Sequence, residues 1–338
     1  MNEVVRLSGI FLASIFLSAA VAAENELFDG LSPSQWLWRM NEAFTEKNYD
    51  GVFSYYNGSD LSTLRVIHAV IDGVQRERLI HMNGVQREII RKGDEVSCIL
   101  QPGDELLTLE NSLPSGPFAR AFTRNFDELS DHYNLTFHGV DRIAGRDAIR
   151  LAISAPDEKR FGHRLWLDTA TGFLLRSEMI DEHGSRLEIF QFSSIQLDMS
   201  ISEDRFEPSA PAGSIVSHLR LKSDTATIKT TGTESNPWYA GWMPRGFKMS
   251  AWDLRQTPNA SKSISTLMYS DGLAAFSVFI EDMPKQGAGN VVSRNGATIV
   301  VTVGVKGPAS MHLITVVGEI PTDTAKRIAR SVVYDSSR

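Results

Sequence analysis

The feature that most limits the fold is a series of short segments rich in β-branched residues. These segments occupy residues 51–56, 64–71, 75–82, 86–91, 95–100 and 105–109. They are separated by Gly58, Asp72-Gly73, Asn83-Gly84, Gly93-Asp94 and Pro102-Gly103. These are turn residues at the spacing of hairpins. The spacing therefore predicts an antiparallel β-meander.

A second series of strands is predicted after an interruption over residues 111–131. Its members are residues 135–140, 148–154, 163–168, 174–180 and 185–192. A single sheet of about ten or eleven strands normally curls or folds over. The concave face of such a sheet could hold a ligand.

A helix is predicted immediately before the meander. Ser32-Pro33-Ser34-Gln35 has the pattern of a capping box with proline at the first helical position. Apolar residues then recur at helical spacing, namely Trp36, Leu37, Met40, Ala43 and Phe44. The helix should run to about Lys47 and cover the strands with this apolar face.

The chain is predicted to form two domains. Residues 24–202 would form the first, and residues 203–218, which contain Pro208 and Pro211, read as a linker. Residues 219–338 would form a smaller domain with strands around residues 265–269, 273–280, 297–303 and 311–317. A final helix capped by Thr322 would complete it, so the fold class is α+β.

Residues 1–23 are typical of a secretory signal peptide. Arg6 precedes an apolar run over residues 7–21, and small residues follow it before Glu24. This run is shorter than the roughly 20 residues that a helix needs to span a bilayer. We therefore expect cleavage near Ala22 or Ala23 and a soluble protein in the periplasm.

Cys98 is the only cysteine, which excludes an internal disulfide. It lies in a predicted strand, where a buried and inert thiol is expected.

Charge is divided unevenly along the chain. Residues 24–218 contain 19 Lys and Arg against 31 Asp and Glu, a net charge of −12, whereas residues 219–338 contain 14 against 9, a net charge of +5. The basic domain would steer an acidic partner. Attraction between the two domains explains the same division equally well. A net-acidic exported chain is a poor candidate for binding nucleic acid.

The usual catalytic signatures are absent from the sequence. It has no HExxH, CxxC or G-x-S-x-G pattern, no Walker loop and no Rossmann glycine pattern. Its 8 histidines are scattered, and no two lie at metal-ligand spacing on a predicted helix. We expect no metal, no cofactor and no enzymatic activity.

Two aromatic groups remain as candidate sites. Phe118, Phe122 and Phe126 recur every four residues, so on a helix they would form one face. With Leu113 this face could close over the concave sheet as a lipid lid, or it could belong to an ordinary core helix. The choice stays open at the level of sequence.

The other group lies in the Pro- and Gly-rich segment 237–247. Trp238, Trp242, Arg245 and Phe247 have the composition of a protein-binding hot spot. The same rings could instead fill the core of the second domain. Both interpretations fit the sequence equally.

Several segments, in order along both domains, resemble the MucB/RseB family of periplasmic regulators of sigma-E-type (AlgU) factors. They are Trp38-Arg39-Met40, residues 48–55, 141–146, 162–168 with Thr171-Gly172, 242–247, 270–274 with 277–281, and 316–321. Each is weak alone, but their shared order is specific. Arg142, Arg146 and Arg164 lie within them and could be structural.

The resemblance implies a first domain like LolA and LolB, an antiparallel half-barrel with helices and a hydrophobic cavity. It also implies binding to the periplasmic segment of a transmembrane anti-sigma factor of the MucA or RseA type. Such binding would protect that factor from first cleavage by a DegS-type protease until an envelope lipid signal, a lipid or lipopolysaccharide, releases it. The family has no catalytic residues to transfer. A homo-oligomer is compatible with the sequence.

Two other classes remain as alternatives. A periplasmic lipid or lipoprotein carrier would fit the first domain alone, but simple carriers of the LolA type lack a second domain of this size. A hydrolase is less well supported, because no motif points to one.

Overall fold

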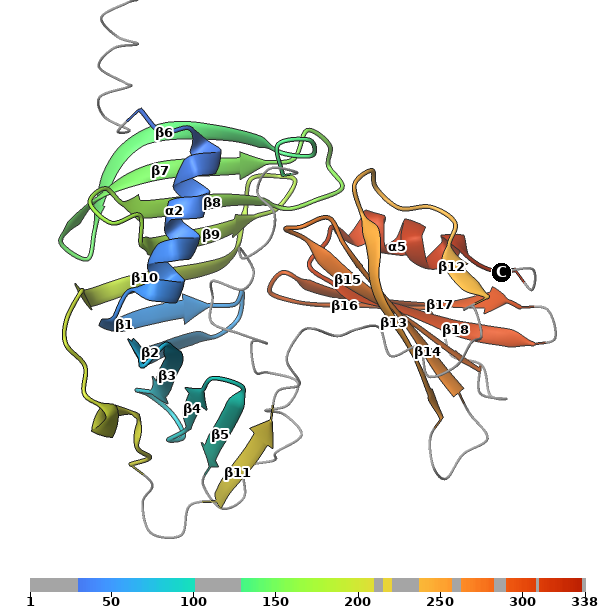
Figure 1. Cartoon of the computed structure of the whole chain (residues 1–338). Coiled ribbons are helices and arrows are strands. Elements are labelled where there is room, and N and C mark those ends of the chain that lie inside the picture. Colours follow the sequence, from blue (N-terminus) through green and yellow to red (C-terminus); the bar gives the residue numbers. More distant parts are fainter. Residues whose placement is uncertain are drawn as a thin grey trace, which may run out of the picture.

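The computed structural model describes residues 30–100, 129–209, 215–220, 237–256, 263–282, 290–307 and 310–335. These residues form two domains, each built on its own antiparallel sheet (Figure 1). The expected signal peptide lies outside the described residues. Within them, no helix is both long and apolar enough to cross a membrane.

Helix α2 (Pro33–Glu46) confirms the predicted capping box. The Ser32 backbone N–H donates to Gln35 Oε1 at 2.7 Å, and the Gln35 N–H donates to Ser32 Oγ at 3.3 Å. Lys47 adopts an extended conformation and ends the helix. The five predicted apolar residues are all buried, so the helix is held by one continuous face.

The first sheet contains eleven strands in the order β11-β5-β4-β3-β2-β1-β10-β9-β8-β7-β6. The strands of the first series are β1 (Tyr49–Tyr56), β2 (Leu61–Ile71), β3 (Val74–His81), β4 (Glu88–Lys92) and β5 (Glu95–Leu100). Those of the second are β6 (Asn134–Ile143), β7 (Arg146–Ser154), β8 (Gly162–Asp168), β9 (Leu174–Ile180) and β10 (Arg186–Leu197). The two series join where β1 pairs with β10.

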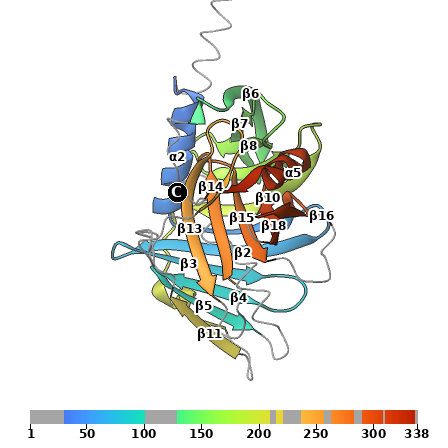
Figure 2. The same cartoon turned by 90° about the vertical axis from the view of Figure 1, so that its right-hand side faces the viewer.

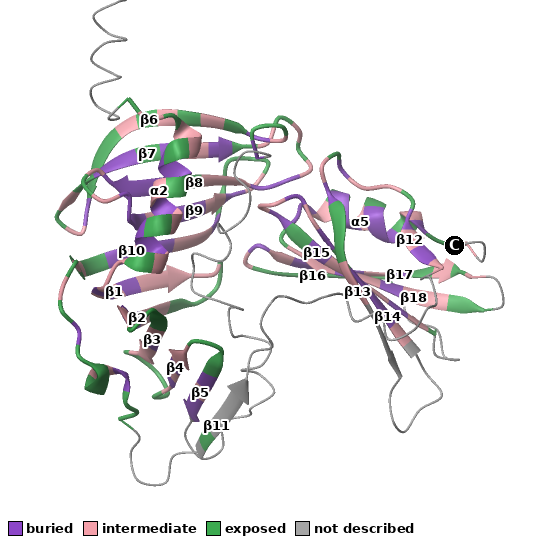
Figure 3. Ribbon diagram, in the orientation of Figure 1, coloured by how far each residue is buried: buried purple, intermediate pink, exposed green. Residues whose placement is uncertain are grey.

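This sheet is the predicted open half-barrel, and α2 lies against one of its faces (Figure 1 and Figure 2). Phe44 of α2 stacks on Phe173 with ring centroids 4.4 Å apart, and Tyr49 meets the same ring edge-on at 4.8 Å. The helix is buried toward the sheet and exposed on its outer side (Figure 3). Cys98 is buried, as predicted.

Residues 203–209 and 215–218, the described parts of the segment expected to be a linker, lie against the first sheet. They contain a short 3-10 helix, η2 (Glu203–Phe206), and most of β11 (Ile215–Arg220), which pairs with β5. Phe206 is fully buried with Ile67, Ile90 and Ile99 on the face of the sheet opposite α2. The difference arises because these packing partners lie more than 100 residues away, where local turn residues give no information.

Polar contacts hold the same segment in place. Arg78 forms a buried ion pair with Glu88 at 2.9 Å and donates to the Arg205 carbonyl at 3.0 Å. Arg205 in turn pairs with Asp50 at 2.8 Å.

The second domain has a six-stranded sheet in the order β13-β14-β15-β18-β17-β16. Its strands are β13 (Lys248–Gln256), β14 (Ser263–Ser270), β15 (Ala275–Asp282), β16 (Val291–Asn295), β17 (Thr298–Lys306) and β18 (Met311–Gly318). Helix α5 (Thr322–Ser331) packs on β17 and β18, and β12 (Trp238–Ala240) pairs with β19 (Val332–Tyr334). The predicted cap at Thr322 is wrong by one residue, because Pro321 holds the N-cap position without a side-chain bond.

Candidate functional site

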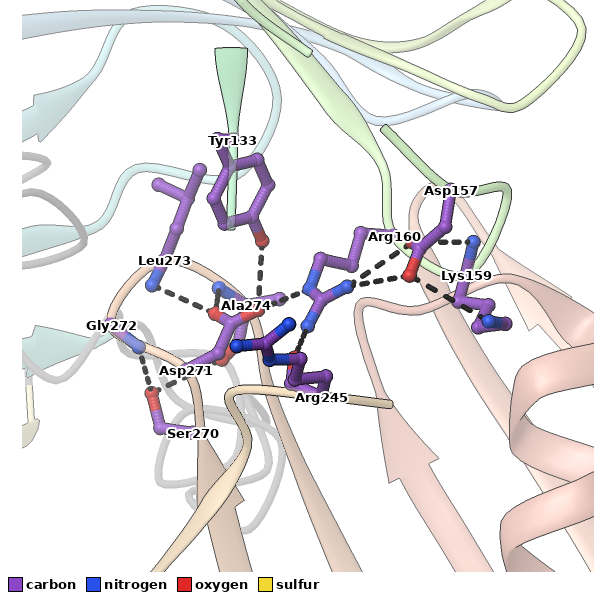
Figure 4. A network of polar contacts seen from close by, with 10 residues as sticks. All are labelled: Tyr133, Asp157, Lys159, Arg160, Arg245, Ser270, Asp271, Gly272, Leu273 and Ala274. Atoms are coloured by element: carbon purple, nitrogen blue, oxygen red, sulfur yellow. Dashed lines mark hydrogen bonds and ion pairs between the residues drawn. The ribbon is translucent and has the colours of Figure 1, made fainter. Parts of the chain in front are cut away.

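The two domains meet through a buried ion pair (Figure 4). Arg160, in the loop between β7 and β8, donates from Nε to Oδ2 of Asp271 at 2.6 Å. The side chains are only 2% and 0% exposed. The Tyr133 hydroxyl donates to the same oxygen at 3.0 Å, and the other oxygen accepts the backbone N–H of Ala274 at 2.8 Å. Both oxygens of the Asp271 carboxylate are therefore satisfied inside the interface.

Arg160 uses its other donors in the same place. Nη1 binds the Asp157 carboxylate at 3.0 Å, and Nη2 donates to the backbone carbonyl of Arg245. The guanidinium also lies over the Phe247 ring, 5.2 Å from its centroid. One side chain of the first domain thus engages two loops of the second.

The surroundings of this ion pair keep neighbouring groups neutral. Burial and the nearby Asp271 carboxylate raise the pKa of Tyr133 well above its usual value. Burial lowers the pKa of His163 to about 4. At pH 7 the interface therefore contains the Arg160 cation and carboxylates, with Tyr133 and His163 uncharged.

A second contact involves the turn between β16 and β17. Ala297 is fully buried against Phe161 and Leu187 of the first domain. Its backbone N–H donates to Glu188 Oε1 at 3.0 Å, while the Tyr55 hydroxyl holds Glu188 Oε2 at 2.8 Å. The two contacts together fix the second domain at two places.

Glycine lies at both contacts because the domains approach closely. Gly296 has φ +58, and a Cβ there would overlap the backbone carbonyl oxygen of Asn57. Gly246 has φ +99, and a Cβ there would overlap the His132 ring. Only glycine combines this conformation with so little space.

Replacing Gly296 by alanine should loosen the domain contact. Positive φ costs a non-glycine residue about 1–2 kcal/mol, and the new methyl group would push against immobile backbone of the other domain. We expect a lower melting temperature and a larger radius of gyration in small-angle X-ray scattering.

Gly73→Ala is the matched control for that change. Gly73 has φ +74, but a Cβ added there would have no atom within 4 Å. This variant should lose only the cost of the positive φ and keep an unchanged radius of gyration. If Gly296→Ala and Gly73→Ala have the same radius of gyration, Gly296 does not govern docking.

The four residues predicted to bind a partner take three different positions. Trp238 is buried in the second-domain core, and its ring centroid lies 5.1 Å from that of Tyr334. Phe247 is buried at the domain interface, and Arg245 has an exposed side chain but contributes its carbonyl there. Trp242 is partly exposed beside α5, with the Arg327 guanidinium 3.8 Å above its ring.

The residues predicted to line a lipid cavity, Leu113, Phe118, Phe122 and Phe126, lie outside the described residues. A cavity of about 650 Å³ opens beside α2, where Arg39, Glu42, Glu46 and Asp198 contribute to its wall. These charged groups suit an acyl chain poorly.

Sequence reasoning missed Arg160 and Tyr133, for which no local pattern exists. Asp271 offered a signal, because it lies in the family-like segment 270–274.

The ion pair also bears on the uneven distribution of net charge between the two domains. Its cation belongs to the acidic domain and its anion to the basic one. Attraction between the net charges therefore does not account for this contact.

Arg146 and Arg164, from the family-like segments, have structural contacts. Arg146 binds the buried Asp168 through two hydrogen bonds of 2.6 and 3.2 Å. Arg164 lies 3.6 Å from the buried Glu178. In the part of the chain that is described, no group of three or more His, Cys, Asp or Glu is placed to hold a metal ion.

Comparison with known families accounts for both domains. Residues 32–210 match the model of the MucB/RseB N-terminal domain, and residues 232–333 match that of the MucB/RseB C-terminal domain. The chain belongs to the MucB/RseB family. It is therefore a regulatory binding protein and not an enzyme.

Individual members of the MucB/RseB family agree with this assignment. The sigma factor AlgU regulatory protein MucB of Pseudomonas aeruginosa is 32% identical over 302 residues, which cover 88% of this chain and 90% of that protein. A crystal structure of MucB in complex with MucA(peri) is 30% identical, covers 90% of this chain and 100% of its own, and has a TM-score of 0.73.

A crystal structure of MucB has a lower TM-score of 0.60, at 29% identity and with 89% of this chain and 98% of its own covered. Coverage is almost the same in the two comparisons. This chain therefore superposes better on MucB in the MucA complex than on that second structure.

Proposed function

We propose that this protein binds the periplasmic segment of a MucA/RseA-type anti-sigma factor and so restrains a sigma-E-type factor. The observation that supports this most strongly is the match to MucB bound to MucA(peri), which extends over both domains at a TM-score of 0.73. A match limited to the half-barrel would have suited a lipid carrier equally well.

The proposed consequence of binding is protection. A bound protein covers the anti-sigma segment and slows its first cleavage by a DegS-type protease. The signal-peptide pattern of residues 1–23 supports the periplasm as the place where this happens.

Release by a lipid is the second part of the proposal. An acyl chain that enters the half-barrel gains about 0.8 kcal/mol per buried CH₂. It releases the partner only if it binds the partner-free state more tightly. By reciprocity, the bound anti-sigma segment must weaken lipid binding by the same factor.

Affinity measurements test this proposal. The full mature chain is titrated with the purified periplasmic segment of the anti-sigma factor from the same organism, with and without lipopolysaccharide. We expect a saturable complex whose affinity falls when lipopolysaccharide is added. If a saturable complex forms and its affinity does not change with lipopolysaccharide, only the release mechanism is wrong. If no complex forms, the proposed function itself is wrong.

A further inference from the structure

A cationic groove lies between Trp242 and the side of α5 that faces away from the sheet. It encloses about 400 Å³, and its wall is formed by Trp242, Asp323, Lys326, Arg327, Arg330 and Ser331. The opposite side of α5 is buried against the sheet through Ala325, Ile328 and Ala329. The groove therefore carries three cations and one carboxylate on a firmly packed helix.

The wall opposite the helix is fixed by hydrogen bonds. The Trp242 backbone N–H donates to Ser331 Oγ at 3.1 Å, and the Gly241 N–H donates to the Ser331 carbonyl at 2.9 Å. The loop that carries Trp242 is thus attached to the last turn of α5. The Arg327 guanidinium lies 3.8 Å above the indole ring. A stacked guanidinium keeps its in-plane N–H donors free to bind a carboxylate.

Two of the three cations have no carboxylate partner among the residues that the structure describes. Lys326 pairs with Asp323 at 3.2 Å, and that carboxylate is 95% exposed. Within the described ranges, no acidic side chain lies within ion-pair distance of Arg327 or Arg330. Arginine is the residue best suited to bind a carboxylate through two parallel hydrogen bonds.

A strand edge continues directly from the groove. β19 begins at Val332, immediately after α5, and pairs only with β12 in the described part of the chain. Val333 and Tyr334 are 41% and 40% exposed. An extended peptide could lie along this edge and bring acidic side chains to the arginines. A bilayer surface would fit less well, because the two arginines border one small groove beside a single indole.

We propose that the groove between Trp242 and α5 binds an acidic segment of the anti-sigma factor, with its carboxylates on Arg327 and Arg330. This inference rests on the proposed function. It adds the place and the chemistry of one contact.

Reversing the charge of the two groove arginines tests this proposal. The full mature chain carrying Arg327→Glu and Arg330→Glu is titrated with the fluorescent periplasmic segment of the same organism's anti-sigma factor. Arginine and tryptophan contacts at binding hot spots are worth more than about tenfold in affinity. We expect at least that loss, together with a weaker dependence of affinity on salt.

The matched control is Lys248→Glu with Lys306→Glu, which changes the net charge of the same domain equally at exposed positions. It should lose less than about threefold, because neither lysine lines the groove and exposed charges are largely screened. Arg330→Glu alone changes one exposed side chain. Its affinity for the segment tests the groove if the double variant fails to fold.

The outcomes separate the two claims. If the unaltered protein does not bind the segment, the proposed function is wrong. If it binds and the groove variants bind equally well, the function stands and the groove assignment is wrong. Loss of binding to phosphatidylglycerol vesicles in the groove variants, with affinity for the segment unchanged, would instead assign the groove to a membrane.

Discussion

Replacing Arg160 by alanine is expected to separate the two domains and to cost about 3–5 kcal/mol of stability. The variant leaves the Asp271 carboxylate fully buried with only Tyr133 and backbone N–H groups as donors. A buried charge without its counter-ion is more costly than the ion pair itself is favourable. The domains can avoid this cost by undocking, which lets water reach Asp271. Calorimetry should show the loss, and X-ray scattering should show a larger radius of gyration.

A double-mutant cycle isolates the interaction energy between Arg160 and Asp271. Arg160→Met and Asp271→Leu should each destabilise the docked state, while the double variant should lose less than the sum of the two, because no unpaired charge remains. Lys159→Ala is the local control. Lys159 lies 3.8 Å from Asp157 and is half-exposed, so its loss should cost less than about 1 kcal/mol. An Arg160→Ala protein with unchanged melting temperature and dimensions would refute the docking role.

Trp36→Ala in α2 should destabilise the first domain by about 3–5 kcal/mol, the range for removing a large aromatic side chain from a core. Trp36 is 0% exposed and lies beneath the Arg39 guanidinium, 4.7 Å from it. The indole has no access to water, so its removal takes away buried apolar surface and leaves a cavity in the core. Denaturant unfolding followed by circular dichroism measures the change.

Trp38, two residues along the same helix, is the natural control. It is 43% exposed, so Trp38→Ala should cost less than about 1 kcal/mol. Equal losses in Trp36→Ala and Trp38→Ala would mean that α2 is not anchored by its buried apolar face.

The parts of the fold that local chemistry determines could be predicted from the sequence. The capping box at Ser32 and the apolar spacing to Phe44 determine α2 within one turn. The hairpin turns from Gly58 to Gly93 divide the meander correctly, whereas the predicted strand 105–109 lies outside the described residues. The features that the sequence did not predict depend on partners far away along the chain. β11 is added to β5 across more than 100 residues, and Phe206 is ordered by a cluster that no local pattern reveals.

For the candidate site too, the sequence indicated local features and missed those that depend on tertiary contacts. Composition drew attention to residues 237–247, but it could not separate a core tryptophan, Trp238, from one that borders a groove, Trp242. The contact between Arg160 and Asp271 joins residues 111 positions apart. Arg245 contributes to it through a backbone carbonyl, which every residue type carries.

The most direct test of the central claim is the rate at which a DegS-type protease cleaves the anti-sigma factor's periplasmic segment, with and without saturating amounts of this protein. Cleavage of an unrelated substrate by the same protease is the control for direct inhibition of the enzyme. We expect cleavage of the segment to slow strongly while the control substrate is cut at its usual rate. Equal rates of segment cleavage with and without the protein would contradict the account.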